Sequence, residues 1–481
     1  MFVWNLLTTW WIYNASFAGA ALAIILNSLL MCVPWLLMRH IKNKLGNTAG
    51  VISLITFWLS FEYIHHQWDL SWPWLTLGNV FALHPQWIQW YEVTGTTGGS
   101  LLTLLVNIVV YHIFKMDRHG DLKKLRTPIG AFILLLLLPL FISLSIAANR
   151  KKALSRSGTR NVVVVQPNVD PYNEKFTAGT QGAQVQNLIA LSEQQLDSAT
   201  SLVVWPETAI PELVNEDSLA AYSLYEPVWQ FLARHPQLSL LSGIDGFTMY
   251  GSEKKTPTAR RDAESGAYYD VYNTAAMLNS STDVQFYHKS KLVPGVETLP
   301  SYLLWMNTLF ESFGGASGTY GRNEHRAVFA DKQHYFFAAP IICYESIYGD
   351  YITEYVRKGA NLLTIITNDG WWGNTQGYRQ HMAYARLRAI ETRRWIARSA
   401  NTGISCFIDP LGTIYNPQPW NKKAAIKMNL EPLQSQTFFV RHGDYLSRIS
   451  NVASVVFLLL LVIFKVRKQL FSKAHAKAMQ V

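Results

Sequence analysis

The distribution of apolar and polar residues divides the chain into membrane-like ends and a mixed middle. Residues 1–38 contain no charged side chain. A helix needs about 20 apolar residues to cross a hydrocarbon core of about 30 Å. We therefore expect membrane spans at residues 17–38, 48–64, 93–114, 128–148 and 449–464, of which the last is short.

Charges in the loops orient these spans. Lys and Arg cluster at residues 39–50, at 115–127 and after 464. Such clusters stay on the cytoplasmic side of a membrane. Residues 65–94 contain no Lys or Arg, and their aromatic residues predict an interfacial cluster on the other side: Trp68, Trp72, Trp74, Trp87, Trp90 and Tyr91. Residues 149–448 should then lie outside the cytoplasm, with Arg150, Lys151 and Lys152 anchored to anionic headgroups.

The middle of the chain alternates short apolar runs with helical patterns. The four valines at 162–165 are typical of a strand that is buried on both faces. We expect strands at 162–165, 201–205, 238–244, 274–278, 337–343, 362–367 and 404–408, and helices at 183–196 and 378–399. This order predicts an α/β domain. The predicted organisation is membrane helices at 1–156, an α/β domain at 157–445, and a final helix with a basic tail at 446–481.

The composition agrees with this division and argues against nucleic acid as a partner. Of the 481 residues, 49% are hydrophobic and 15% are charged, which is too apolar for an ordinary soluble protein. The net charge of +10 belongs mostly to the membrane flanks, and no nucleic-acid motif accompanies it. Three cysteines, at 32, 343 and 406, provide no disulfide framework, and we expect no pairing between the last two.

Three expected strands end in candidates for chemistry: Glu207 in WPETAIP, Lys289 in YHKSKLVP, and Cys343 in IICYE. Each also has an ordinary interpretation, as a loop glutamate, a solvated lysine and a small core cysteine. Together, a general base, a fixed positive charge and a thiol form a coherent acyl-transfer site. Their spacing along the chain does not show that they converge.

These motifs, together with TNDGWWG at 367–373, resemble the nitrilase superfamily, whose members use a Glu-Lys-Cys triad on an α-β-β-α sandwich. Combined with the membrane spans, the chain is similar to the apolipoprotein N-acyltransferases of bacterial inner membranes. The resemblance covers nearly the whole chain. It implies a polytopic helical membrane domain joined to a nitrilase-like sandwich, and about two further helices that this chain lacks at its amino end.

The resemblance also implies roles for residues that match its motifs. Glu207 matches the general base, Lys289 the essential lysine and Cys343 the nucleophile. Further matches near the active site or lining its pocket are Glu297, Tyr344, Glu345 and Trp371. The family commonly has Pro-Phe-Gly-Glu after the lysine, whereas this chain has Pro-Gly-Val-Glu at 294–297, which keeps the glutamate and changes the loop.

The implied reaction moves an acyl chain from a phospholipid, through a cysteine thioester, to the α-amino group of a diacylglyceryl-cysteine on an apolipoprotein. The resemblance implies a monomer in the bacterial inner membrane, with its catalytic domain in the periplasm and with no cofactor or metal. A membrane-tethered amidohydrolase would use the same triad, and the sequence leaves it open. A non-enzymatic transport or scaffold protein would favour charged residues within the spans, where only Glu62 occurs, near a span end.

Overall fold

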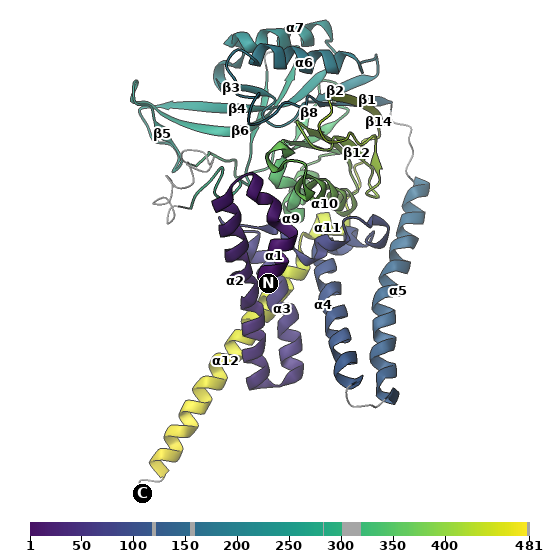
Figure 1. Ribbon diagram of the computed structural model, residues 1–481, viewed down its shortest axis with the longest axis vertical. Helices are drawn as coiled ribbons and strands as arrows, with labels where there is room; N and C mark the ends of the chain where they lie inside the picture. Colours follow the sequence, from purple (N-terminus) through teal and green to yellow (C-terminus); the bar gives the residue numbers. More distant parts are fainter. Residues whose placement is uncertain (118–121, 154–158, 282, 301–318, 479–481) are drawn as a thin grey trace.

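The computed structural model describes residues 1–117, 122–153, 159–281, 283–300 and 319–478. Long helices form one end of the molecule and an α/β domain forms the other (Figure 1). The helices of the first part are α1 (Phe2–Thr9), α2 (Phe17–Leu45), α3 (Asn47–His65), α4 (Tyr91–Asp117), α5 (Leu122–Ala153) and α12 (Tyr445–Ala478). Short 3-10 helices connect them: η1 (Trp10–Asn14), η2 (Pro73–Leu75), η3 (Leu77–Phe81) and η4 (Pro85–Trp87).

Four of the described helices are long and apolar enough to cross a membrane: Phe17–Leu45, Tyr91–Met116, Leu125–Lys152 and Tyr445–Leu470. The chain is therefore a multi-pass membrane protein. The fifth expected span, at 48–64, forms helix α3 but is not among the four, since polar residues and Glu62 interrupt its apolar sequence. Helix α3 nevertheless lies beside α2 (Figure 1), and the Glu62 carboxylate accepts hydrogen bonds from the Trp58 indole and the Leu77 amide.

The expected interfacial aromatic cluster contains both exposed and buried residues. Trp87 is exposed, as expected of an interfacial residue. Trp74 is 1% exposed, because its ring packs against Trp11 and Trp372 at centroid distances of 4.8 and 5.5 Å. For Trp74 the interfacial prediction is therefore wrong, since the α/β domain covers this ring. It is also wrong for Tyr91, which is 0% exposed and whose hydroxyl donates to the Gly78 carbonyl.

The α/β domain contains two mixed sheets. The first has strand order β14-β1-β2-β4-β6-β5, with β3 paired to β4 and β7 to β6. Its strands are β1 (Arg160–Gln166), β2 (Thr200–Val204), β3 (Ile210–Asn215), β4 (Ser239–Gly251), β5 (Arg260–Arg261), β6 (Tyr268–Asn279), β7 (Gln285–His288) and β14 (Ala424–Leu430). The second has the order β13-β12-β11-β10-β9-β8. Its strands are β8 (Phe329–Ala330), β9 (Phe337–Ile342), β10 (Leu362–Thr367), β11 (Trp395–Ala400), β12 (Cys406–Ile408) and β13 (Ile414–Tyr415).

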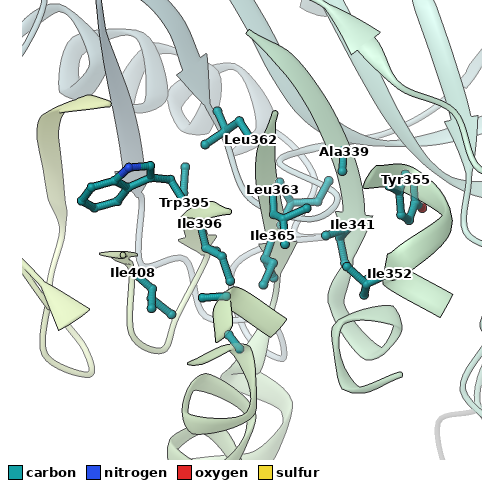
Figure 2. Packing of buried hydrophobic residues seen from close by; sticks show 14 of the residues in the cluster. Ala339, Ile341, Ile352, Tyr355, Leu362, Leu363, Ile365, Trp395, Ile396 and Ile408 are labelled. Atoms are coloured by element: carbon teal, nitrogen blue, oxygen red, sulfur yellow. The ribbon is translucent and has the colours of Figure 1, made fainter. Parts of the chain in front are cut away.

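Helices cover the outer faces of both sheets, so the predicted α-β-β-α sandwich is confirmed. The helices of this domain are α6 (Gln181–Glu193), α7 (Glu226–Arg234), α9 (Gly349–Arg357), α10 (Gln376–Thr392) and α11 (Phe438–His442), with 3-10 helices η5 (Glu216–Ala221), η6 (Ser223–Tyr225), η8 (Cys343–Ile347) and η9 (Asp369–Trp372). Alternate valines of β1 face different cores: Val163 and Val165 pack with α6 and α7, while Val162 and Val164 face the second sheet. Figure 2 shows part of the core around the second sheet, with Ile341, Ile365 and Ile396 on neighbouring strands.

One expected helix is wrong in its last seven residues. The sequence predicts a helix at 378–399, but α10 ends at Thr392, Arg393 adopts a left-handed φ of 52°, and β11 begins at Trp395. The charges of Arg394 and Arg398 make this stretch look like an exposed helix, yet both side chains are buried and donate to backbone carbonyls. Because these two guanidinium groups find their partners inside the protein, the strand cannot be recognised from polarity alone.

Ion pairs and hydrogen bonds join the helical part to the α/β domain. Arg393 Nε lies 2.6 Å from Glu92 Oε2, and Glu391 Oε1 accepts from the backbone of Thr96 at 2.9 Å. The Thr96 amide is available because α4 is interrupted at Gly95, whose φ of 62° is easily adopted by glycine and whose missing side chain leaves room for the ring of Phe439. The nearby α/β elements are therefore tied directly to a membrane helix.

Candidate active site

The structure brings Glu207, Lys289 and Cys343 together from three different strand ends. Glu207 follows β2, Lys289 directly follows β7, and Cys343 directly follows β9. Lys289 Nζ lies 3.2 Å from Glu207 Oε1. Both carboxylate and ammonium act electrostatically on the Cys343 thiol. The three residues are 6%, 1% and 8% exposed, respectively, so the site is shielded from bulk water.

A second carboxylate and an amide complete the charge cluster. Lys289 Nζ lies 2.8 Å from Glu297 Oε1, so the altered Pro-Gly-Val-Glu loop still places its glutamate on the lysine. Asn273 Nδ2 donates to Glu207 Oε1 at 2.8 Å and to Glu297 Oε1 at 3.1 Å. The Asn368 amide donates to the other oxygen of Glu207 at 3.0 Å. Each oxygen of Glu207 therefore has a fixed donor.

Burial and charge together set the protonation states. Burial lowers the pKa of Lys289, but Glu207 and Glu297 outweigh it and hold this pKa well above its ordinary value. Burial raises the pKa of Glu207, but Lys289, Asn273 and the buried Lys175 outweigh it and leave this pKa below its ordinary value. Burial, followed by the Glu207 charge, raises the pKa of the Cys343 thiol. At neutral pH the site therefore holds a thiol, a carboxylate and an ammonium.

The turn at Cys343 is held by Glu345. Cys343 has a φ of 50°, a left-handed conformation that costs energy in a residue with a Cβ. Glu345 Oε2 accepts from the Ile342 amide at 2.9 Å, and Oε1 accepts from the Ser290 amide at 2.7 Å and from the Tyr351 hydroxyl at 2.6 Å. Glu345 is fully buried. Its carboxylate thus joins the segment after Lys289 to the segment that presents the thiol.

Tyr344 connects the same turn to the membrane part. Its hydroxyl donates to the carbonyl of Ser71 at 2.8 Å, and the Ser71 hydroxyl lies 2.7 Å from the Tyr348 hydroxyl. Ser71 belongs to the segment that follows α3. The two tyrosines therefore hold the start and the end of the nucleophile turn against this segment.

Trp371 belongs to η9, which follows β10, and it contacts Tyr172 in the segment after β1. Its indole meets the ring of Tyr172 edge-on at a centroid distance of 5.2 Å, and the Tyr172 hydroxyl donates to the Trp371 carbonyl at 2.9 Å. Its neighbour Trp372 packs instead against Trp11, at 4.9 Å. The two tryptophans of TNDGWWG thus have different surroundings.

Two family models match the chain. "Carbon-nitrogen hydrolase" matches residues 161–434, and "Apolipoprotein N-acyltransferase N-terminal domain" matches residues 1–109. The apolipoprotein N-acyltransferase of Chlorobaculum tepidum is 32% identical over 93% of this chain and 84% of its own length. The chain belongs to the apolipoprotein N-acyltransferase family. A second member, from Geobacter metallireducens, is 28% identical over 83% of this chain and 72% of its own length.

Solved structures also resemble the chain. A nitrilase-superfamily protein of Saccharomyces cerevisiae aligns with a TM-score of 0.39 and 18% identity, over 57% of this chain and 91% of that chain. Membership of the family makes the chain an acyltransferase of the nitrilase superfamily, which uses a Glu-Lys-Cys triad.

The sequence did not reveal several residues that shape this site. Asn273 lies within β6, and Lys175 lies in a loop, where its ammonium donates to the Glu207 carbonyl at 3.4 Å. Neither residue belongs to a motif with Glu207, and both come close to it only when the chain folds. Within the residues that the structure describes, no group of three or more His, Cys, Asp and Glu side chains is arranged to hold a metal ion.

Proposed function

We propose that this chain transfers an acyl chain from a phospholipid to Cys343, and from Cys343 to the α-amino group of an N-terminal diacylglyceryl-cysteine on an apolipoprotein. The observation that carries the proposal is the buried cluster of Glu207, Lys289 and Glu297 beside a cysteine, on a turn that hydrogen bonds to the membrane part. Both substrates are anchored in lipid, so a site at this junction spares them extraction into water.

In the first half-reaction the thiol attacks the ester carbonyl of the phospholipid. Glu207 takes the proton from Cys343 Sγ as the sulfur–carbon bond forms. Lys289, held protonated by two carboxylates, stabilises the negative oxygen of the tetrahedral intermediate. The ester C–O bond then breaks, and the leaving alkoxide of the lysophospholipid receives the proton from Glu207. This leaves a thioester on Cys343.

In the second half-reaction the neutral α-amine attacks the thioester carbon. Glu207 accepts a proton from the amine as the C–N bond forms, and the C–S bond breaks. The departing sulfur receives that proton, which regenerates the thiol and releases the N-acylated lipoprotein. Water would produce a free fatty acid instead, and the low exposure of Cys343 disfavours that outcome.

The other predicted residues have supporting roles in this proposal. Glu297 holds the lysine, Glu345 holds the nucleophile turn, and Tyr344 and Trp371 line the approach of the acyl chains. The reaction requires no cofactor or metal, and the enzyme works as a monomer. The bacterial inner membrane is the proposed location.

We further propose that the α/β domain faces the periplasm. The basic ends of α2 and α12 lie at the end of the helices away from the α/β domain (Figure 1). Basic residues in such positions are retained in the cytoplasm. The opposite end, with the domain and the thiol, then lies at the outer leaflet.

Mass spectrometry of the purified protein tests the function. After incubation with phospholipid, the intact mass should rise by one acyl group, located on the peptide that contains Cys343. Addition of a diacylated N-terminal cysteine peptide should remove this mass and yield a triacylated peptide. Loss of the acyl group at the same rate with and without the peptide would favour the amidohydrolase.

A further inference from the structure

A fully buried histidine lies against the carbonyl side of the nucleophile turn. His381, in α10, has its Nε2 at 3.1 Å from the carbonyl oxygen of Cys343 and at 2.9 Å from the hydroxyl of Ser346. Ser346 Oγ donates to the same Cys343 carbonyl at 2.7 Å. The peptide group that follows the nucleophile is therefore bound by two side chains at once.

The other side of the ring faces a buried ion pair. His381 Nδ1 lies 2.9 Å from Asp369 Oδ1, and Asp369 Oδ2 lies 2.8 Å from Arg398 Nη2. Burial raises the pKa of Asp369, but the Arg398 charge and the hydrogen bonds with His381 and Arg398 outweigh it and hold this pKa below its ordinary value, so the carboxylate is ionised. His381 Nδ1 also lies 3.1 Å from Arg398 Nη2, so both members of the ion pair contact this side of the ring.

The ring has little freedom to move. The indoles of Trp74 and Trp372 pack against it at centroid distances of 5.9 and 5.5 Å. His381 is 1% exposed. Because Asp369 orients one nitrogen and the indoles confine the ring, the second nitrogen stays directed at the Cys343 carbonyl. This arrangement resembles a positioning device more than a general acid or base.

We propose that His381 is a positioning residue for the reaction: oriented by Asp369, it fixes the carbonyl of Cys343 and so keeps the nucleophile in its left-handed turn. The φ of 50° at Cys343 is unfavourable and persists only where surrounding bonds impose it. A released turn would relax toward an ordinary conformation and carry the thiol away from Lys289 and Glu207. Misplacement of a reacting atom by about 1 Å can cost about 100-fold in rate.

Two substitutions of similar size test whether His381 acts through its hydrogen bond or only by filling space. His381→Gln keeps an amide donor near the Nε2 position, whereas His381→Leu removes every donor. We expect the rate constant for acylation of Cys343 by phospholipid to fall by about 100-fold in H381L and by about 10-fold in H381Q. The KM for phospholipid should stay within about twofold in both, because the ring does not lie on the substrate. The exposed residue His84 provides the control variant, His84→Gln, which should retain the wild-type rate.

A second readout is independent of the acyl donor, so it stands even if the proposed function, on which the rate measurement rests, is wrong. Iodoacetamide alkylation, followed by peptide mapping, reports each cysteine separately. Release of the turn should expose the thiol, so alkylation of Cys343 should rise several-fold in H381L and less in H381Q. Cys406, which is fully buried, serves as the internal reference and should remain slow.

The acylation and alkylation rates together decide whether His381 positions the nucleophile. Slower acylation with faster alkylation of Cys343 alone, graded from H381Q to H381L, supports this role. Equal behaviour of the two variants would overturn it, as would a parallel rise in Cys406 alkylation, which marks general loosening. If the wild type takes up no acyl group, the proposed function fails, and the alkylation series still decides the role of His381.

Discussion

The ammonium of Lys289 and the carboxylate of Glu207 lie 3.2 Å apart, and both are almost completely buried. A buried pair of this kind acts strongly on the neighbouring Cys343 thiol, because bulk water does not screen either charge. It also makes the two residues mutually dependent, since removal of one leaves the other charged in an apolar setting.

Substitution of Glu207 by glutamine should block formation of the acyl-enzyme. Glutamine preserves the size of the side chain but cannot accept the thiol proton. We expect the acylation rate to fall by about 100-fold or more, as measured by intact-protein mass spectrometry. Cys343→Ala should remove the adduct, and Cys343→Ser should be nearly inactive because a hydroxyl is much harder to deprotonate. An acyl mass that persists in Cys343→Ala would place the nucleophile elsewhere.

Substitutions of Glu207 and Lys289 should shift the pH dependence of Cys343 reactivity in opposite directions. The Glu207 carboxylate raises the pKa of Cys343 and the Lys289 ammonium lowers it. Glu207→Gln should therefore move the pH profile of Cys343 alkylation to lower pH, and Lys289→Met should move it to higher pH. Both variants should nevertheless lose acylation. Profiles of iodoacetamide alkylation measured over a range of pH provide the check, and shifts in the same direction would contradict the described charge arrangement.

Loss of Lys289 should also destabilise the α/β domain. Lys289→Met leaves the carboxylates of Glu207 and Glu297 buried without their cation, and breaking a buried pair costs about 3–5 kcal/mol. The double variant Lys289→Met, Glu297→Gln should recover part of this loss without recovering activity. Thermal unfolding measures both effects, with Lys254→Met as the control on an exposed lysine. A double variant no more stable than the single one would argue against repulsion between the two carboxylates.

Reporter fusions should place the α/β domain in the periplasm. A fusion after Gly46, between α2 and α3, should report the cytoplasm, and a fusion within residues 250–265 should report the periplasm. The reason is the retention of Arg39, Lys42 and Lys44 on the cytoplasmic side. The reverse pattern would refute the proposed orientation.

Sequence patterns predicted an α/β domain and the three strand ends, because buried runs and the polar residues that follow them are local features. The two-sheet sandwich was implied only by the resemblance to the nitrilase superfamily. The convergence of Glu207, Lys289 and Cys343 depends on which strands are neighbours, and no local pattern contains that information. For the same reason Asn273 and His381 escaped notice, since each acts on a partner more than 30 residues away. The strand at 395–400 was missed because its buried arginines look like solvated ones.

The hydrogen bonds that Tyr344 and Tyr348 make with Ser71 fasten the nucleophile turn to the segment that leaves α3. The thiol therefore cannot rise or sink relative to the bilayer without carrying that segment along. These bonds therefore fix the height of the thiol above the lipid surface. Under the proposed function, the phospholipid ester and the lipoprotein amine must therefore both reach the thiol at this one level.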